Sequence, residues 1–307
     1  MVKRKKALCV TAAFLLLHVI LTAVATKIVY DKVFDRYDKE SEIDESFSDL
    51  VEGREKHSFT SGDERLYGWL YDTDGTDDVI VMMPGLRSSA DDYLPLIKSF
   101  TEGKMDVFIF DPAGSCMSEG DSAEGFPRAT QDLCAAVDYV EENISQYDDI
   151  FLFGHSRGGY AVCCATGEMD DVSAAASVNA PNSPMEGVVS PVESKAGIFA
   201  YNNYPLLWAY QATIFGTAAV NTSAADVIGS SDVPILVVQA ENDTIVSPHR
   251  FSVFSHKDEV KREGAEFLLY EGDKDTEGHS GVLFSEGRVN EDLSEKILEF
   301  YKKLYRG

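Results

Sequence analysis

Short runs of apolar residues recur along the chain from residue 57 onward. Two of them, 57–61 and 65–72, are close enough to form an opening antiparallel pair. Six more lie at 79–83, 107–110, 150–153, 173–179, 235–240 and 266–270, and most are apolar at nearly every position. Because strands covered on both faces have no polar side, such runs predict buried strands.

Segments with helical spacing of apolar residues lie between and after the later runs. They cover 129–142, 158–168, 249–262 and 290–305. An alternation of strands and helices predicts a mainly parallel sheet with helices on both faces, which is the α/β class. Functional groups in such sheets gather where the strands end. The chain of 307 residues is long enough for one large domain or two small ones.

One connection is much longer than the others. More than fifty residues separate the runs at 173–179 and 235–240, and residues 196–225 within this connection carry no formal charge. A connection of this length is expected to have structure of its own. We interpret it as a small helical cap over the carboxyl edge of the sheet. Ordinary core packing and a second membrane span are the alternatives, and the polar residues Asn202, Asn203 and Gln211 disfavour a span.

The N-terminus has the pattern of a membrane segment. Residues 7–25 carry no formal charge and follow four basic residues at 3–6. A helix of that length is roughly 28 Å long, close to the hydrocarbon thickness of a bilayer. Basic flanks stay on the cytoplasmic side, so the rest of the chain is expected to be exported. We interpret residues 1–25 as a signal anchor; a cleaved signal peptide is the alternative, because residues 23–25 read Ala-Val-Ala.

Residues 26–54 have a different composition. Apolar residues at 29, 33, 37, 43, 47 and 50 are separated by charged ones, which is helical spacing. This pattern predicts a juxtamembrane amphipathic stalk that packs one face on the folded domain.

The charge and the cysteines exclude several classes of function. The formal net charge is −25, and removing residues 1–25, which hold four basic and no acidic residues, makes it −29. Such a field repels nucleic acid and anionic lipid surfaces, so we expect no nucleic-acid partner. The five cysteines form neither a disulfide framework nor a zinc motif, and there is no nucleotide-binding glycine motif. No metal or cofactor is therefore indicated.

Residues 150–160 read IFLFGHSRGGY, a buried-strand pattern followed by a serine between two glycines. A serine hydroxyl acts as a nucleophile when it is exposed, held rigidly and placed beside a base and hydrogen-bond donors. A sharp strand-to-helix turn provides the first two conditions, and it leaves no room for side chains at Gly154 and Gly158. Ser156 is therefore a candidate nucleophile. The alternative is a glycine-rich surface turn.

Two later loops contain the partners that a serine nucleophile needs. Asp243 follows the run at 235–240, and His279 lies in a glycine-bearing loop after the run at 266–270. A base that takes the serine proton and a carboxylate that orients the base complete a triad. The competing residues are His249 and His256 for the base, both within the predicted helix 249–262, and Glu241 and Asp226 for the acid.

These segments, in this order and strand context, resemble the α/β hydrolases. The elbow GHSRGG, the segment ENDTIVSP and the segment GHS match the group of serine hydrolases with a short cap, which includes serine aminopeptidases and monoacylglycerol lipases, over about 55–305. The resemblance implies Ser156 as nucleophile, His279 as general base and acid, and Asp243 as the residue that fixes the imidazole tautomer. It also implies the backbone N–H groups of Leu86 and Arg157 as oxyanion donors.

Two segments depart from the pattern of the group. Many relatives have His-Gly where this chain has Pro84-Gly85, and D-x-R-G-x-G-x-S where this chain has DPAGSCMS from Asp111. We expect Asp111 to be an element of the fold and His155 to be a packing and hydrogen-bonding residue of the elbow.

The resemblance implies an α/β-hydrolase domain at 55–307 with a cap insertion at about 181–233. We expect a membrane-anchored, outward-facing serine hydrolase that cleaves an ester, thioester or amide through an acyl-enzyme. The charge-free cap favours an uncharged or acyl-bearing substrate. The alternatives are an aminopeptidase-like amidase, an acyltransferase, and a non-catalytic binding module on the same fold.

Overall fold

The central sheet of the computed structural model has the predicted strands. The structure describes residues 2–39, 43–73, 75–144, 146–169, 171–272, 276 and 278–305, and within these ranges eight strands form one sheet in the order β1-β2-β4-β3-β5-β6-β7-β8. The strands are β1 Glu55–Ser61, β2 Glu64–Tyr71, β3 Asp78–Met83, β4 Asp106–Asp111, β5 Asp149–His155, β6 Val172–Val178, β7 Ile235–Ala240 and β8 Ala265–Tyr270. Each predicted strand is confirmed to within two residues at either end.

The sheet is parallel apart from its first edge. β1 pairs antiparallel with β2, and β2 pairs antiparallel with β4, whereas the pairs from β4 through β3 to β8 are parallel. The parallel strands therefore end at one common edge.

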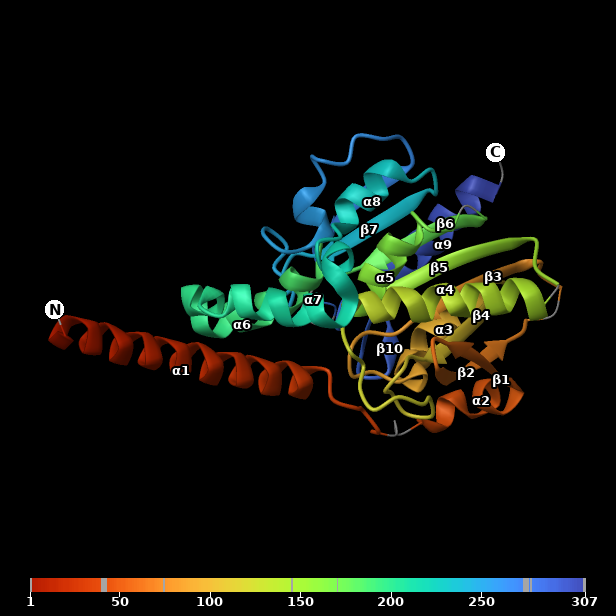
Figure 1. Cartoon of the computed structure of the whole chain (residues 1–307). Coiled ribbons are helices and arrows are strands. Elements are labelled where there is room, and N and C mark those ends of the chain that lie inside the picture. The colour runs from red at the N-terminus through yellow and green to blue at the C-terminus, as the bar shows by residue number, and fades with distance from the viewer. Residues whose placement is uncertain are drawn as a thin grey trace.

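Helices cover both faces of the sheet (Figure 1). α4 Phe126–Asn143, α5 Arg157–Ala165 and α8 Ala224–Ser230 pack on the face that holds Val79 and Val81. α3 Leu94–Glu102 and α9 Glu291–Tyr305 pack on the opposite face, which holds Ile80 and Met82. Successive residues of a strand point to opposite faces, so a strand covered on both is apolar at every position. This arrangement explains the continuous apolar runs.

The predicted helix at 249–262 is wrong. Only a 3₁₀ turn, η4 Val253–His256, forms there. The Ser252 hydroxyl oxygen accepts a hydrogen bond from the N–H of Ser255, and the N–H of Val253 donates to the carbonyl of Ala180. These hydrogen bonds hold the backbone in a non-helical conformation despite the helical spacing of its apolar residues. α3, in contrast, was not predicted.

The long connection between β6 and β7 is helical. It contains α6 Pro184–Ala196, η3 Gly197–Tyr201, α7 Tyr204–Val220 and then α8. α8 packs on α5, whereas α6 and α7 project away from the sheet (Figure 1). We use the term cap below for α6, η3 and α7.

The N-terminal helix α1 is longer than the predicted membrane segment. It runs unbroken over Val2–Val33, so the boundary predicted after residue 25 lies inside the helix. The part Cys9–Val33 is long and apolar enough to cross a membrane, a criterion that a signal sequence also meets. Beyond Val33 the predicted stalk is not one helix. Its described part has an extended stretch, bridged by Asp35 to Ser122, followed by η1 Glu45–Phe47 and α2 Ser48–Gly53.

Candidate active site

Ser156 lies at the turn between β5 and α5. Its φ of 57° and ψ of −115° are outside the conformations that residues with a side chain favour. A Cβ on Gly154 would lie 2.2 Å from the carbonyl oxygen of Gly158, and a Cβ on Gly158 would lie 2.2 Å from that of Met83. Both glycines are therefore required by close backbone approach, which distinguishes this turn from a glycine-rich surface turn.

The structure brings Ser156, His279 and Asp243 together. The Nε2 atom of His279 lies 2.8 Å from Ser156 Oγ, and its Nδ1 atom lies 2.8 Å from Asp243 Oδ2. The competing residues are elsewhere: His256 contacts Glu259 at 3.0 Å, and the other three competitors, His249, Glu241 and Asp226, are exposed on the surface.

The carboxylate of Asp243 is buried and held from several sides. Its Oδ1 atom accepts hydrogen bonds from the N–H groups of Ile245 at 2.8 Å and Val246 at 2.9 Å, and its Oδ2 atom accepts one from the Gln239 side chain at 3.2 Å. An acceptor facing Nδ1 of His279 favours the tautomer with the proton on that nitrogen. Nε2 is then free to accept the proton of the Ser156 hydroxyl.

Comparisons with known proteins identify chains with a similar fold. A family model described as "Serine aminopeptidase, S33" matches residues 74–216. An esterase of Pyrococcus furiosus superposes with a TM-score of 0.64 at 18% identity, covering 87% of this chain and 98% of that one. The chain has the α/β-hydrolase fold, and the family model matches 143 of its 307 residues. The match and the structural neighbours support a serine hydrolase enzyme, as the sequence predicts.

The chain also resembles two other solved structures with different descriptions. One is Est1E from Butyrivibrio proteoclasticus with ferulic acid bound, at a TM-score of 0.60 and 14% identity, covering 82% of this chain and 100% of that one. Another is the acylaminoacyl peptidase of Pyrococcus horikoshii, at 0.60 and 17%, covering 81% of this chain and 41% of that one. No curated protein matches the sequence. At these identities the neighbours show the fold alone.

A buried hydrogen-bond chain supports the His279 loop of the hydrolase from below. The carbonyl oxygen of His279 accepts from Asn179 Nδ2 at 2.7 Å and lies 2.8 Å from His155 Nε2. A carbonyl only accepts, so Nε2 of His155 carries the proton. Its Nδ1 atom, 2.9 Å from the hydroxyl of Tyr93, is then the acceptor of that hydroxyl's proton. The Tyr93 oxygen accepts in turn from the N–H of Gly85 at 2.9 Å.

The burial of His155 agrees with a neutral ring that carries its one proton on Nε2. Burial lowers the pKa of the His155 imidazole to about 3, so the ring is neutral at ordinary pH. Tyr93 and Asn179 are not predicted from the sequence. Asn179 directly follows β6, at the edge where functional groups gather, and this position is the one signal that could have identified it.

Of the two predicted oxyanion donors, Arg157 directly follows Ser156, and Leu86 directly follows Gly85, on which a Cβ would lie 3.4 Å from the Cβ of Ser156. The N–H of Arg157 belongs to the first turn of α5, where backbone N–H groups have no acceptor within the helix. The Arg157 side chain is buried and donates to the carbonyls of Ala123 at 2.8 Å and Gly125 at 3.0 Å, so only its backbone is available to a substrate. Leu86 follows Gly85, whose N–H is fixed by Tyr93.

Asp111 is the last residue of β4. Its carboxylate is buried and accepts hydrogen bonds from the N–H groups of Ala90 at 2.9 Å and Met117 at 3.2 Å. Burial raises its pKa to about 6. These contacts join two loops, as expected for a fold element.

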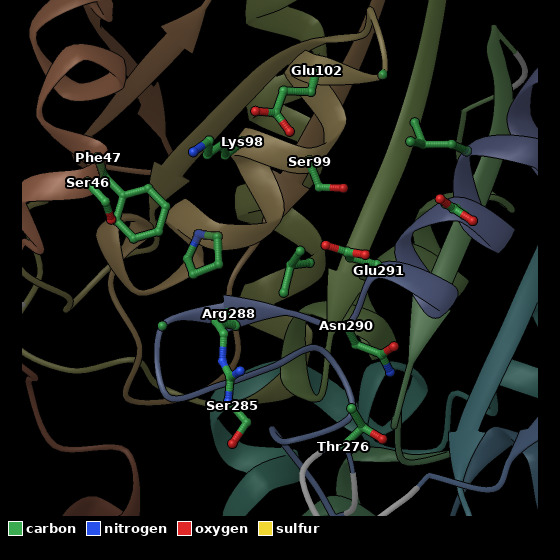
Figure 2. A pocket seen from close by; sticks show the side chains of 16 residues that line it. Ser46, Phe47, Lys98, Ser99, Glu102, Thr276, Ser285, Arg288, Asn290 and Glu291 are labelled. Atoms are coloured by element: carbon green, nitrogen blue, oxygen red, sulfur yellow. The ribbon is translucent and has the colours of Figure 1, made fainter.

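A separate cavity is shown in Figure 2. It has a volume of about 750 Å³ and is lined by residues of η1, α3, α9 and the hairpin of β9 Phe284–Ser285 and β10 Arg288–Val289. Lys98, Glu102 and Arg288 are among its lining residues, whereas Ser156, Asp243 and His279 are not. Across the described residues, no group of three or more His, Cys, Asp or Glu side chains is placed to hold a metal ion.

Proposed function

We propose that the protein is a membrane-anchored serine hydrolase that cleaves an ester through an acyl-enzyme intermediate. Ser156 is the nucleophile, His279 the general base and acid, and Asp243 the orienting carboxylate. The observation that carries the proposal is the continuous hydrogen-bond chain from the Ser156 hydroxyl through His279 to Asp243, with both links at 2.8 Å.

The geometry supports the following steps. Ser156 Oγ attacks the ester carbonyl carbon while its proton moves to His279 Nε2. The negative oxygen of the tetrahedral intermediate accepts hydrogen bonds from the N–H groups of Arg157 and Leu86. When the intermediate collapses, the leaving alcohol takes the proton from Nε2 and an acyl-serine remains. Water then attacks the acyl-serine, gives a proton to Nε2, and the carboxylic acid leaves as the proton returns to Ser156.

The length and packing of α1 support a retained anchor over a cleaved signal peptide. The candidate cleavage site after residue 25 lies inside the helix, about two turns before its end, and Thr26, Tyr30 and Phe34 are buried against the domain. Cleavage would cut a helix whose next turns are part of the fold. The basic residues at 3–6 favour a cytoplasmic N-terminus and an outward-facing domain.

The charge-free stretch 196–225 supports an uncharged, acyl-bearing substrate. Hydrolysis of an amide is the second candidate, and the family description favours it because it names an aminopeptidase. The two reactions differ in the leaving group and use the same triad.

Steady-state hydrolysis by the full chain in detergent tests the proposal. We expect p-nitrophenyl esters to be cleaved faster than aminoacyl p-nitroanilides, and Ser156→Ala to lower turnover by about 10⁴-fold or more. Ser230→Ala is the matched control, because this exposed hydroxyl bonds only to carbonyls of its own helix. Unchanged turnover in Ser156→Ala would refute the nucleophile, and faster cleavage of the anilides would replace the esterase with the amidase.

A further inference from the structure

One face of α1 packs against the cap. Thr26 and Tyr30 are 8% and 3% exposed, and the same face continues to Thr22, which is partly buried. The covering cap element is α7. The ring of Tyr30 meets that of Tyr210 edge-on at 5.2 Å, and the Tyr210 hydroxyl donates to Asp31 at 2.7 Å. These contacts join α7 to the last two turns of α1, where Lys27 also donates to the Tyr210 hydroxyl at 3.2 Å.

The position of these contacts along α1 indicates how deep α7 lies in the bilayer. Lys27 is the first formally charged residue after Lys6, so an uncharged stretch of twenty residues, 7–26, is available to the hydrocarbon. At 1.5 Å per residue this stretch is about 30 Å long, the thickness of a bilayer core. Lys27 then marks the outer boundary, and Thr22 lies about 7 Å inside it. Helices that lie in a membrane surface are immersed by about 5–10 Å.

The surface of α7 is compatible with immersion in the bilayer to this depth. α7 carries no charged residue, and its exposed side chains include Tyr204 and Ile214. The charged residues of the cap belong to α6, where Glu193 pairs with Arg250 outside the cap. The cap extends from the sheet in the same direction as the N-terminal end of α1 (Figure 1).

The turn that holds Ser156 is connected to the contact between α1 and α7 through Arg157 and Gly125. The Arg157 side chain, next to Ser156, donates to the carbonyl of Gly125, and a Cβ on Gly125 would lie 2.5 Å from the Tyr30 hydroxyl and 2.9 Å from the ring of Phe215 on α7. The nucleophile, α1 and α7 therefore share one packed region.

We infer that α7 lies in the outer leaflet of the bilayer that α1 spans, and that the hydrolase takes its acyl-bearing substrate from that leaflet. The inference rests on the proposed function for the reaction and on α1 as a membrane span. The partner of the exposed face of α7 is the lipid surface, because the contact between α1 and α7 is continuous with the membrane-spanning part of α1.

The two tryptophans of the chain provide a direct test. Trp208 lies on α7, whereas Trp69 is buried in β2. We propose reconstitution of the full chain into phosphatidylcholine vesicles whose acyl chains carry bromine at defined depths, with the Trp208→Phe variant as the control. Trp208 emission, taken as the difference between the two proteins, is expected to be quenched at least twofold by bromine in the upper half of the acyl chain. Quenching equal to that of the control would overturn the inference.

An activity measurement separates this inference from the proposed function. Ile214→Lys places a charge on the exposed side of α7, and Met117→Lys places one at an exposed site outside the cap. We expect Ile214→Lys to slow hydrolysis of a long-chain ester embedded in vesicles about tenfold. Hydrolysis of water-soluble p-nitrophenyl acetate is expected to stay unchanged, as are both activities of Met117→Lys.

Each outcome of this comparison has one meaning. Equal loss on both substrates, or no loss on either, would overturn the leaflet inference. Absence of hydrolysis by the unaltered chain would refute the proposed function and leave the quenching result to decide where α7 lies.

Discussion

Replacement of His155 by glutamine tests the buried chain beneath His279 through the pH dependence of stability. The imidazole of His155 donates to the carbonyl of His279 and accepts from Tyr93, and burial lowers its pKa to about 3. An unfolded histidine has a pKa near 6.5. The folded state therefore binds fewer protons than the unfolded state, so the stabilisation is fully present above about pH 6.5 and is lost as the pH falls toward 3.

The magnitude follows from the two pKa values. Each pH unit between them costs about 1.4 kcal/mol, so His155 alone removes about 3 kcal/mol of unfolding free energy between pH 7.5 and pH 4.5. In His155→Gln this contribution disappears, because the amide offers a donor and an acceptor but does not titrate. The variant is expected to be less stable at pH 7.5 and to lose less on acidification.

Urea unfolding of both proteins in detergent, followed by tryptophan fluorescence at several pH values, measures this difference. We expect the gap in unfolding free energy to narrow by about 3 kcal/mol from pH 7.5 to pH 4.5. If the unfolding free energies of the two proteins instead change in parallel with pH, the reasoning is refuted, because a charged imidazole is then tolerated in the fold.

Three further substitutions test other parts of the structure. Gly158→Ala places a Cβ 2.2 Å from a backbone oxygen and should lower the Tm by 10 °C or more, whereas Gly229→Ala, with open space around it, should not; equal Tm values would contradict the elbow geometry. Asp243→Asn should lower turnover by about 10³ to 10⁴-fold at unchanged fold, and near-normal turnover would exclude its orienting role. Asp132→Ala removes a buried partner of Arg128 and should cost about 3–5 kcal/mol in urea unfolding, against under about 1 kcal/mol for Glu124→Ala, which removes a half-exposed partner of the same arginine.

The strands and the elbow could be predicted because their signals are local. Strands buried on both faces are apolar throughout, and the glycines at 154 and 158 are required by backbone contact at a single turn. Asp243 and His279 could be proposed because each lies in the loop that follows a strand of the parallel sheet.

The features that could not be predicted depend on distant contacts. Tyr93 meets His155 across 62 residues, and nothing near Tyr93 in the sequence marks it. The segment 249–262 has helical spacing, but the bond from Val253 to Ala180 holds it in another conformation. α1 continues past residue 25 because Thr26 and Tyr30 pack on the cap, which the hydropathy of the segment does not report.

Covalent labelling with a fluorophosphonate probe tests the central claim most directly. The probe reacts with a serine that is activated by a neighbouring base, and digestion followed by mass spectrometry locates the adduct. We expect one adduct per chain, on Ser156, absent after denaturation and strongly reduced in His279→Ala. An active, folded protein that leaves Ser156 unlabelled, or that carries the adduct on another serine, would contradict the account.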